Sequence, residues 1–336
     1  MPLDNDVILD IKDLVVHYET DDATFRAVNG VDILLRKGKT LGLVGETGAG
    51  KTTTVLSILR LVASPPGVIK NGSIILDGRD ILMLNEREMD KIRGNEVSMI
   101  FQDPMTSLNP VLTVGDQIAE VIAVHQNITR AQASERARIM LENVGIPGNR
   151  SDEYPYQFSG GMKQRVMIAI ALACNPLLLI ADEPTTALDV TIQAQVLELM
   201  KSLRTTYNTS MILITHDLGI VAEICDEVSI IYAGKIVEHG TLEDIFEHPM
   251  HPYTEGLFNS LPDLKNRRAK LKPIKGLMVD PSNLPSGCTF HPRCDYADKL
   301  CSAEEPKRRT ISETHSIRCH AYERQGFRLT RDINHG

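Results

Sequence analysis

Several features that would assign the sequence to a class at once are missing from it. The longest apolar run, Val166–Cys174, has nine residues, whereas a membrane-spanning helix needs about 20. The N-terminal residues show neither the basic nor the apolar segment of a signal peptide. There is no internal repeat and no low-complexity segment. We therefore expect a soluble, cytoplasmic protein.

An excess of basic charge is also missing. The 336 residues carry 44 acidic and 36 basic side chains, for a formal net charge of −8. Proteins that bind nucleic acid usually carry a basic surface, so we expect no nucleic-acid partner. At 42% hydrophobic residues the composition is that of a globular protein. The length favours one large domain and a smaller one.

Cysteine is scarce except near the C-terminus. Cys174 and Cys225 stand alone in apolar surroundings, and the other four cysteines lie within the last fifty residues. Thiols in the cytosol stay reduced, so such a group suggests a metal site before it suggests disulfides.

The hydrophobic pattern predicts an α/β protein. β-type runs alternate with segments of helical apolar spacing, which indicates a mostly parallel sheet with helices and antiparallel edge strands. The expected strands lie at 7–11, 41–44, 72–76, 97–101, 177–181, 211–215 and 228–232. We expect a nucleotide-binding domain over residues 1–250, with an inserted helical subdomain at about 103–165. The proline-rich residues 251–336 are expected to form a small loop-rich module with its own core.

The strongest motif is a phosphate-binding loop (P-loop), G-x-x-x-x-G-K-[ST], between an expected strand and an expected helix. Its glycines let backbone N–H groups surround a phosphate, and the start of the helix adds partial positive charge. Lys51 should reach the β- and γ-phosphates, and the Thr52 hydroxyl should bind Mg²⁺. The expected ATP-binding residues here are Gly45, Glu46, Thr47, Gly48, Ala49, Gly50, Lys51, Thr52 and Thr53.

Polar residues follow three other expected strands. Gln102, the pair Asp182 and Glu183, and His216 each come directly after an apolar run. In open α/β sheets, ligands bind at the carboxyl ends of the strands, so these side chains and the P-loop are expected to face one nucleotide. Asp182 suits a Mg²⁺-binding carboxylate, and Glu183 suits a general base for an attacking water.

Five motifs, taken in their order along the chain, resemble those of ATP-binding-cassette (ABC) ATPases over residues 7–245. Residues 158–165 (FSGGMKQR) resemble the family signature, 187–189 the D-loop with Asp189, Gln102 the Q-loop and His216 the switch histidine. The resemblance implies Mg²⁺ bound through Thr52, Gln102 and Asp182. It also implies a head-to-tail dimer in which Ser159, Gly160 and Gly161 of one chain close over ATP on the other. Met162 departs from the family, which mostly has Gln there.

Family members stack adenine on an aromatic residue upstream of the P-loop. Tyr18 is the best match, because a flat phenol buries apolar area without demanding base-specific hydrogen bonds. Phe25 is the alternative.

Longer stretches resemble the ATP-binding subunits of dipeptide and oligopeptide importers. They are residues 99–110, 167–189, 251–254 (HPYT) and 285–294. This resemblance implies an ATPase at the cytoplasmic face of the membrane. It implies as partners a second, different ATPase subunit, two membrane permease subunits and an extracytoplasmic peptide-binding protein. A nickel-chelate importer is the alternative. A non-transport ABC ATPase acting on nucleic acid or ribosomes, or a P-loop kinase or GTPase, fits the sequence less well.

The C-terminal cysteines Cys288, Cys294, Cys301 and Cys319 have the spacing C-x5-C-x6-C-x17-C. Structural zinc sites usually contain a C-x(2–4)-C pair, which is missing here, whereas a [4Fe–4S] cluster takes four thiolates at wider spacing. We therefore expect a [4Fe–4S] cluster before Zn²⁺. Three histidines keep zinc open as an alternative, namely His291, His315 and His320, and disulfides or four reduced thiols also stay open.

Overall fold

A computed structural model of the chain describes residues 6–102, 107–186, 188–261, 272–324 and 326–329. The chain divides into two compact units made of interleaved segments. Unit 1 comprises residues 1–10, 34–41 and 74–224, and unit 2 comprises 11–33, 42–73 and 225–336. The P-loop and the described residues of the expected C-terminal module, 251–336, called the C-terminal extension below, therefore belong to the same unit. The boundary expected at residue 250 divides the chain into two consecutive segments, which is a different division from these interleaved units.

Unit 1 is built on a parallel sheet. Strands β6 (Val97–Ile100), β7 (Leu178–Asp182) and β8 (Ser210–Thr215) pair in parallel. Every residue of β7 and β8 is buried, as their continuous apolar sequences predict. In the register, Ile100 pairs with Ala181, and Asp182 pairs with Ile214. The three strands therefore end at the same edge, and the residues after them emerge together.

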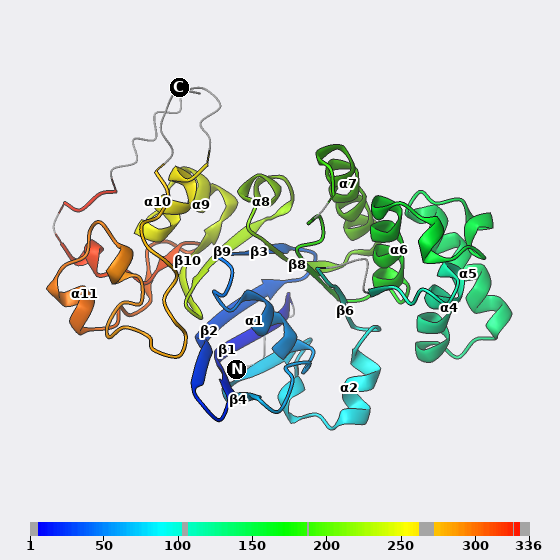
Figure 1. The fold of residues 1–336 in the computed structure, drawn as a ribbon, viewed down its shortest axis with the longest axis horizontal. Helices are drawn as coiled ribbons and strands as arrows, with labels where there is room; N and C mark the ends of the chain where they lie inside the picture. Colours follow the sequence, from blue (N-terminus) through cyan, green and yellow to red (C-terminus); the bar gives the residue numbers. More distant parts are fainter. Residues whose placement is uncertain (1–5, 103–106, 187, 262–271, 325, 330–336) are drawn as a thin grey trace. The chain divides into compact units, whose positions relative to one another are not determined.

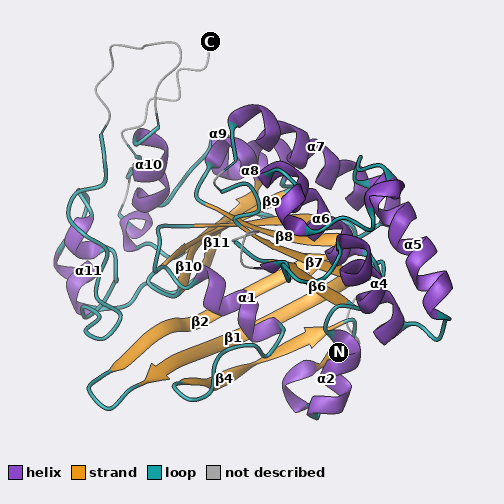
Figure 2. Ribbon diagram, turned by 45° about the vertical axis from the view of Figure 1, so that its right-hand side comes forward, coloured by secondary structure: helices purple, strands orange, loops and turns teal. Residues whose placement is uncertain are grey.

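Helices of unit 1 begin where the sequence offers a capping side chain. Thr113, Thr129, Ser159 and Asp189 each accept a hydrogen bond from a backbone N–H three residues later. Figure 2 shows α4, α5 and α6 grouped together, and of these α4 and α5 lie within the residue range expected for the helical subdomain. The α-helices of this unit are α2 (Glu86–Ile92), α4 (Val114–His125), α5 (Arg130–Asn143), α6 (Gly160–Leu172), α7 (Val190–Tyr207) and α8 (Leu218–Ile224).

Unit 2 carries antiparallel pairing. Strands β9 (Glu227–Tyr232) and β10 (Lys235–Thr241) form a hairpin, drawn side by side in Figure 1. The extension adds two short strands beyond β10, namely β12 (Ser316–Ile317) and β11 (Arg309–Thr310). The fold class is therefore confirmed as an α/β fold with a mostly parallel sheet, helices and antiparallel edge strands.

The remaining strands include long ones that the sequence only partly predicted. Strands β2, β1, β4 and β5 form a separate sheet in that order. The hairpin partner β2 was not expected, because its mixed polar sequence lacks a clear apolar alternation. These strands are β1 (Val7–Glu19), β2 (Thr24–Arg36), β4 (Gly67–Leu76) and β5 (Arg79–Asp80), and β3 (Thr40–Val44) leads into the P-loop.

Three α-helices of unit 2 belong to the region after β10, and α1 (Lys51–Ile58) follows the P-loop. The three are α9 (Leu242–Glu247), α10 (Pro252–Asn259) and α11 (Lys299–Ala303). Five short 3-10 helices complete the described elements, at Ile81–Met83, Gly148–Arg150, Pro155–Gln157, His291–Arg293 and His320–Glu323. Among the described helices, none is both long and apolar enough to cross a membrane.

The expectation that the C-terminal module has a separate core is wrong. Tyr232 of β9, Tyr253 of α10 and Phe290 of the extension pack their rings together, with centroids 4.8 to 5.3 Å apart. Tyr232 and Tyr253 are fully buried and Phe290 nearly so. Aromatic side chains bury more area than any others, so these contacts make one core of the extension and the strand that precedes it. The sequence could not show this, because Tyr232 and Phe290 are 58 positions apart and come together only in the folded chain.

Candidate nucleotide-binding site

The P-loop of unit 2 links β3 to α1 through backbone that only glycine adopts easily. Gly48 and Gly50 have φ of 84° and 100°, in the left-handed region. A Cβ at Gly45 would lie 2.2 Å from the carbonyl oxygen of Ile231, and one at Gly50 would lie 2.3 Å from that of Ala27. The glycines of the motif are therefore required by the loop's own packing, in addition to the approach of a phosphate.

Lys51 is the first residue of α1 and is buried. Its Nζ donates to the carbonyl oxygens of Gly45 at 2.7 Å and Glu46 at 3.0 Å. The ammonium group is therefore held inside the loop by two of the loop's own carbonyl oxygens. Thr52 follows it and is exposed at the start of the helix. A cation, a hydroxyl and helix N–H groups gathered in one turn suit a polyphosphate with its metal ion.

Tyr18 lies next to this turn. Its hydroxyl is 3.3 Å from the Oγ1 of Thr53, and its ring is half-buried. The alternative, Phe25, is in β2 and 36% exposed, with no ring contact to another described aromatic residue. The contact with Thr53 favours Tyr18 as the aromatic residue beside the P-loop.

Glu46 of the P-loop is bound by two residues of the C-terminal extension. Its backbone N–H donates to the hydroxyl of Tyr253 at 2.9 Å. Its carboxylate accepts two hydrogen bonds from Arg293, at 2.6 Å from Nη1 and 3.0 Å from Nη2. The sequence analysis missed both partners. In the sequence, these partners stand in the motifs HPYT (251–254) and HPRC (291–294), for which no part in the nucleotide site was expected.

A second polar group lies at the strand ends of unit 1, around the carboxylate of Glu183. Its Oε2 accepts from Gln102 Nε2 at 2.9 Å and from the Thr186 hydroxyl at 3.0 Å, and its Oε1 lies 3.2 Å from His216 Nδ1. The predicted convergence of Gln102, Glu183 and His216 thus agrees with the structure. Thr186 was not predicted.

Glu183 is held in an uncommon backbone conformation. Its φ is 47°, in the left-handed region that residues with a Cβ seldom adopt. Its backbone N–H is fixed by the carbonyl of Ile214 at 2.9 Å. Strained backbone is often found at functional sites. The Glu183 side chain is 14% exposed, whereas that of His216 is 67% exposed, so His216 is much more open to solvent than the carboxylate it contacts.

Asp182 is the last residue of β7 and is buried. The register pairs it with Ile214 of β8, at the same edge as the Glu183 cluster. A buried carboxylate at a strand end is chemically suited to hold Mg²⁺. Of the other two residues expected to bind Mg²⁺, Gln102 also lies at this edge, whereas Thr52 belongs to unit 2.

The signature residues open α6. Ser159 caps the helix by accepting from the N–H of Met162 at 3.4 Å, and both Ser159 and Gly160 are exposed. A Cβ at Gly161 would lie 2.4 Å from Ile192 Cγ2 at the start of α7, whereas one at Gly160 would lie 4.0 Å from its nearest neighbour. Asp189 caps α7 by accepting from Ile192 N–H at 2.9 Å. Met162 accepts a hydrogen bond at its sulfur from Arg150 at 3.5 Å.

All four C-terminal cysteines line one pocket of unit 2, together with His251, Phe290 and His320, among others. Burial raises the pKa of the Cys319 thiol to about 12 and that of Cys294 to about 11, and it raises the pKa of Cys288 and Cys301 as well. Among the described residues, no group of three or more His, Cys, Asp or Glu side chains is arranged to hold a metal ion. The predicted metal site is therefore not confirmed.

The histidines considered as zinc ligands divide into two groups. His291 and His320 line the cysteine pocket. His315 does not, because its Nε2 lies 2.8 Å from the fully buried carboxylate of Glu238.

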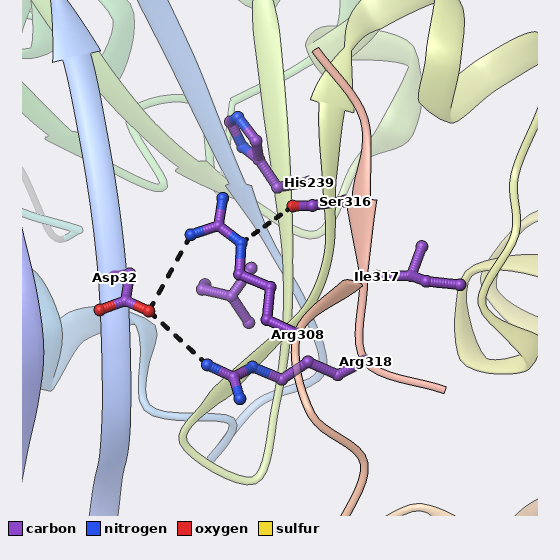
Figure 3. Close-up of a pocket in the computed structure, with 7 residues that line it drawn as sticks. Asp32, His239, Arg308, Ser316, Ile317 and Arg318 are labelled. Atoms are coloured by element: carbon purple, nitrogen blue, oxygen red, sulfur yellow. Dashed lines mark hydrogen bonds and ion pairs between the residues drawn. The ribbon is translucent and has the colours of Figure 1, made fainter. Parts of the chain in front are cut away.

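A further pocket lies between β10, β12 and Asp32, and Figure 3 shows Arg308 and Arg318 directed at this carboxylate. Their guanidinium groups lie 4.0 and 3.6 Å from Asp32 Oδ2. The pocket also contains His239, whose Nδ1 is 3.0 Å from the Ser229 hydroxyl. Burial, followed by the charges of Arg308 and His315, lowers the pKa of His239 to about 4. This histidine is therefore neutral at pH 7.

Comparisons with known proteins agree with these features. The ABC transporter family matches residues 28–186, and the oligopeptide/dipeptide transporter C-terminal region matches residues 237–301. Among solved structures, a dimeric bacterial ABC transporter cassette, MJ0796, is similar to this chain with a TM-score of 0.63 and 25% identity, over 70% of this chain and 99% of that one.

The chain therefore belongs to the ABC transporter family of ATPases. Within it, the most similar curated proteins include the oligopeptide transport ATP-binding protein AppD of Bacillus subtilis. It is 52% identical over 95% of this chain and 98% of its own length. The oligopeptide transport ATP-binding protein OppD of Salmonella typhimurium is 47% identical over 91% of both chains. The predicted family is thus confirmed along nearly the whole sequence.

Proposed function

We propose that this protein binds and hydrolyses ATP to drive the import of short peptides by an ABC transporter. One observation carries the hydrolytic part: Gln102, Thr186 and His216 all contact the carboxylate of Glu183 where the strands of unit 1 end. The names of its relatives support the peptide substrate.

In this proposal the P-loop binds the phosphates of ATP. Backbone N–H groups of the P-loop other than that of Glu46 surround them, and Lys51 neutralises charge on the β- and γ-phosphates. Thr52, Gln102 and Asp182 hold Mg²⁺, which supplies further positive charge on the phosphate oxygens when bound. Tyr18 stacks on adenine. The P-loop geometry of unit 2 supports the phosphate assignment, and family membership supports the assignments to Gln102 and Asp182.

Glu183 is the proposed general base. It accepts a proton from the water that attacks the γ-phosphate, and the positioned carboxylate makes that water a better nucleophile. His216 contacts Glu183 and is exposed, so it is suited to sense the γ-phosphate and orient the water. Removing a positioned general base typically slows a reaction by about 10²–10⁴.

The signature residues act on a second ATPase subunit. Ser159, Gly160 and Gly161 open a 13-residue helix, whose N-terminal N–H groups suit a γ-phosphate presented by a partner. Asp189 lies at the start of α7 and belongs to the same dimer contact. We propose that the partner is a different ATPase subunit and that both work at the cytoplasmic face of the membrane. Two permease subunits and an extracytoplasmic peptide-binding protein complete the transporter. The surface at residues 107–110 is the proposed permease contact.

We also propose that Cys288, Cys294, Cys301 and Cys319 hold a [4Fe–4S] cluster, with Zn²⁺ as the alternative. The donor set supports this, because four thiols line one largely apolar pocket and such a cluster takes four thiolates. Burial raises the pKa of these thiols, so they stay protonated without a metal, and the positive charge of a bound metal would stabilise them as thiolates.

Metal analysis of anaerobically purified protein tests the cluster. The proposal predicts about four irons per chain and broad absorbance near 400 nm, whereas Zn²⁺ predicts one colourless ion. Cys301→Ser should lose most of the iron, while Cys174→Ser, at an isolated buried cysteine, should keep it. Protein with neither iron nor zinc would contradict the proposal.

Purification of the tagged protein from membranes tests the transport function. Co-purification of permease subunits and a second ATPase subunit is expected, with loss of labelled-peptide uptake when Glu183 is replaced by Gln. Uptake of a nickel chelate in place of peptide would identify the alternative importer. Recovery of ribosomes or nucleic acid without permeases would contradict transport. Sedimentation should show that the isolated chain dimerises only weakly.

A further inference from the structure

Glu46 of the P-loop makes contacts on both of its sides. Toward the loop, its carbonyl oxygen accepts from Lys51 Nζ at 3.0 Å. Toward the extension, its N–H donates to Tyr253 and its carboxylate accepts from Arg293. The same residue therefore connects the phosphate-binding lysine with side chains 207 and 247 positions later in the chain.

Arg293 is held in place by several contacts other than the one with Glu46. Its side chain is only 5% exposed, its Nε donates to the carbonyl of Lys275 at 2.9 Å, and its Nη2 lies 3.4 Å from the carbonyl oxygen of Gly276. Its guanidinium carbon also lies 5.8 Å from the ring centroid of Tyr232. A guanidinium held in one plane offers a pair of its other donors to a carboxylate as a fork, which fixes both distance and direction.

Tyr253 is fixed as firmly. It is fully buried, and its ring packs against Tyr232 and Phe290. Burial raises the pKa of its hydroxyl, so the group stays protonated and accepts the Glu46 N–H through a lone pair. The N–H of Glu46 is therefore already used.

Besides fixing the position of Glu46, the Arg293 contact neutralises the charge of its carboxylate. Glu46 puts a carboxylate on a loop whose ligand is a polyanion, and like charges at short range repel each other. Arg293 pairs with this carboxylate through both oxygens. A loop with a neutralised, immobile Glu46 keeps its remaining N–H groups aimed at the phosphates without reorganisation.

We propose that Arg293 and Tyr253 are positioning residues of the ATP site: they fix Glu46 in the P-loop, and Arg293 cancels its charge beside the triphosphate. The inference rests on the proposed ATP-binding function and assigns to the C-terminal extension a direct part in it. Neither residue touches the nucleotide in this proposal.

Equilibrium binding of ATP with Mg²⁺ to the full chain is the test, with turnover measured in parallel. Arg293→Gln should weaken affinity by about 5- to 100-fold, the usual range of coupling between sites, and raise KM while kcat at saturating ATP changes less than about threefold. Arg293→Lys, which keeps the charge but loses the fork, should fall between Arg293→Gln and wild type.

Charge rescue separates positioning from general support of the fold. Glu46→Gln in the Arg293→Gln background removes the unpaired carboxylate and should recover at least threefold of the lost affinity. Tyr253→Phe removes only the hydroxyl and should weaken affinity by about 2- to 10-fold, the worth of one hydrogen bond. It also keeps the test available if Arg293→Gln does not fold. Arg308→Gln is the matched control, because Arg308 pairs with Asp32 and should leave affinity within twofold.

Wild-type affinity in folded Arg293→Gln or Tyr253→Phe would overturn the inference, as would a double variant no better than Arg293→Gln alone. Failure of the proposed function has a different signature, because wild-type protein would then bind no ATP.

Discussion

The two polar groups of this protein are supported in opposite ways. The carboxylate of Glu183 is contacted by Gln102 and His216, which follow neighbouring strands and belong to motifs legible in the sequence, and by Thr186, which was not predicted. The P-loop is also a legible motif, but its Glu46 is fixed by Tyr253 and Arg293 of the extension. The hydrolytic group thus needs only local sheet geometry, whereas the binding loop depends on a segment more than 200 residues away.

This difference bears on what each region can tolerate. Changes around Glu183 should alter the chemical step and leave binding intact, because its partners act on a side chain at a strand end. Changes in the extension should alter binding and leave the chemical step intact, because they act on the shape and charge of the P-loop. Variants that separate these two quantities test the comparison.

The largest effect is expected at Glu183. Glu183→Gln keeps the hydrogen-bonding shape but removes the proton acceptor, so hydrolysis should slow by about 10²–10⁴ while ATP binding persists. Steady-state turnover and equilibrium ATP binding of the same preparation measure the two quantities. Glu198→Gln on the exposed face of α7 is the matched control and should behave as wild type. Turnover of Glu183→Gln within threefold of wild type would remove Glu183 from the chemistry.

A smaller effect is expected where α6 meets α7. Gly161→Ala places a Cβ 2.4 Å from Ile192 Cγ2, so overpacking should lower the free energy of unfolding by about 1–3 kcal/mol. Gly160→Ala shares the gain in helix propensity but meets nothing closer than 4.0 Å, so it should be neutral or slightly stabilising. Urea denaturation of the pair isolates the contact. Equal stability of the two variants would show that α7 adjusts.

The smallest effect concerns pH and unit 2. Because burial lowers the pKa of folded His239 to about 4, the unfolded chain binds more protons than the folded chain between pH 4 and 6.5. The free energy of unfolding should therefore fall as the pH is lowered through this window, by at most about 1.4 kcal/mol per pH unit for this group. His239→Asn should reduce that slope. Identical slopes for wild type and His239→Asn would contradict the contribution of His239.

Sequence patterns predicted the parts of the fold whose cause is local. Continuous apolar runs predicted β7 and β8, and the helix starts at Ser159 and Asp189 follow from side-chain caps that act within three residues. The gathering of Gln102, Glu183 and His216 followed from one rule about the ends of parallel strands.

Patterns did not predict what depends on distant packing. The need for glycine at 161 comes from Ile192 on another helix, and the partner of Glu46 comes from a loop that looked like a separate module. The strand β2 was missed because polar residues interrupt its alternation. The cysteine spacing predicted a metal site; the four thiols line one pocket, and the metal stays a proposal.

One measurement tests the central claim most directly: ATP affinity and saturated turnover, determined side by side for Glu183→Gln and Arg293→Gln in the full chain. The account predicts a crossover. Glu183→Gln should keep its affinity and lose turnover by about 10²–10⁴, and Arg293→Gln should lose affinity by about 5- to 100-fold and keep its turnover. Loss of the same quantity by similar factors in both folded variants would contradict the division between a locally built hydrolytic group and a binding loop held by the extension.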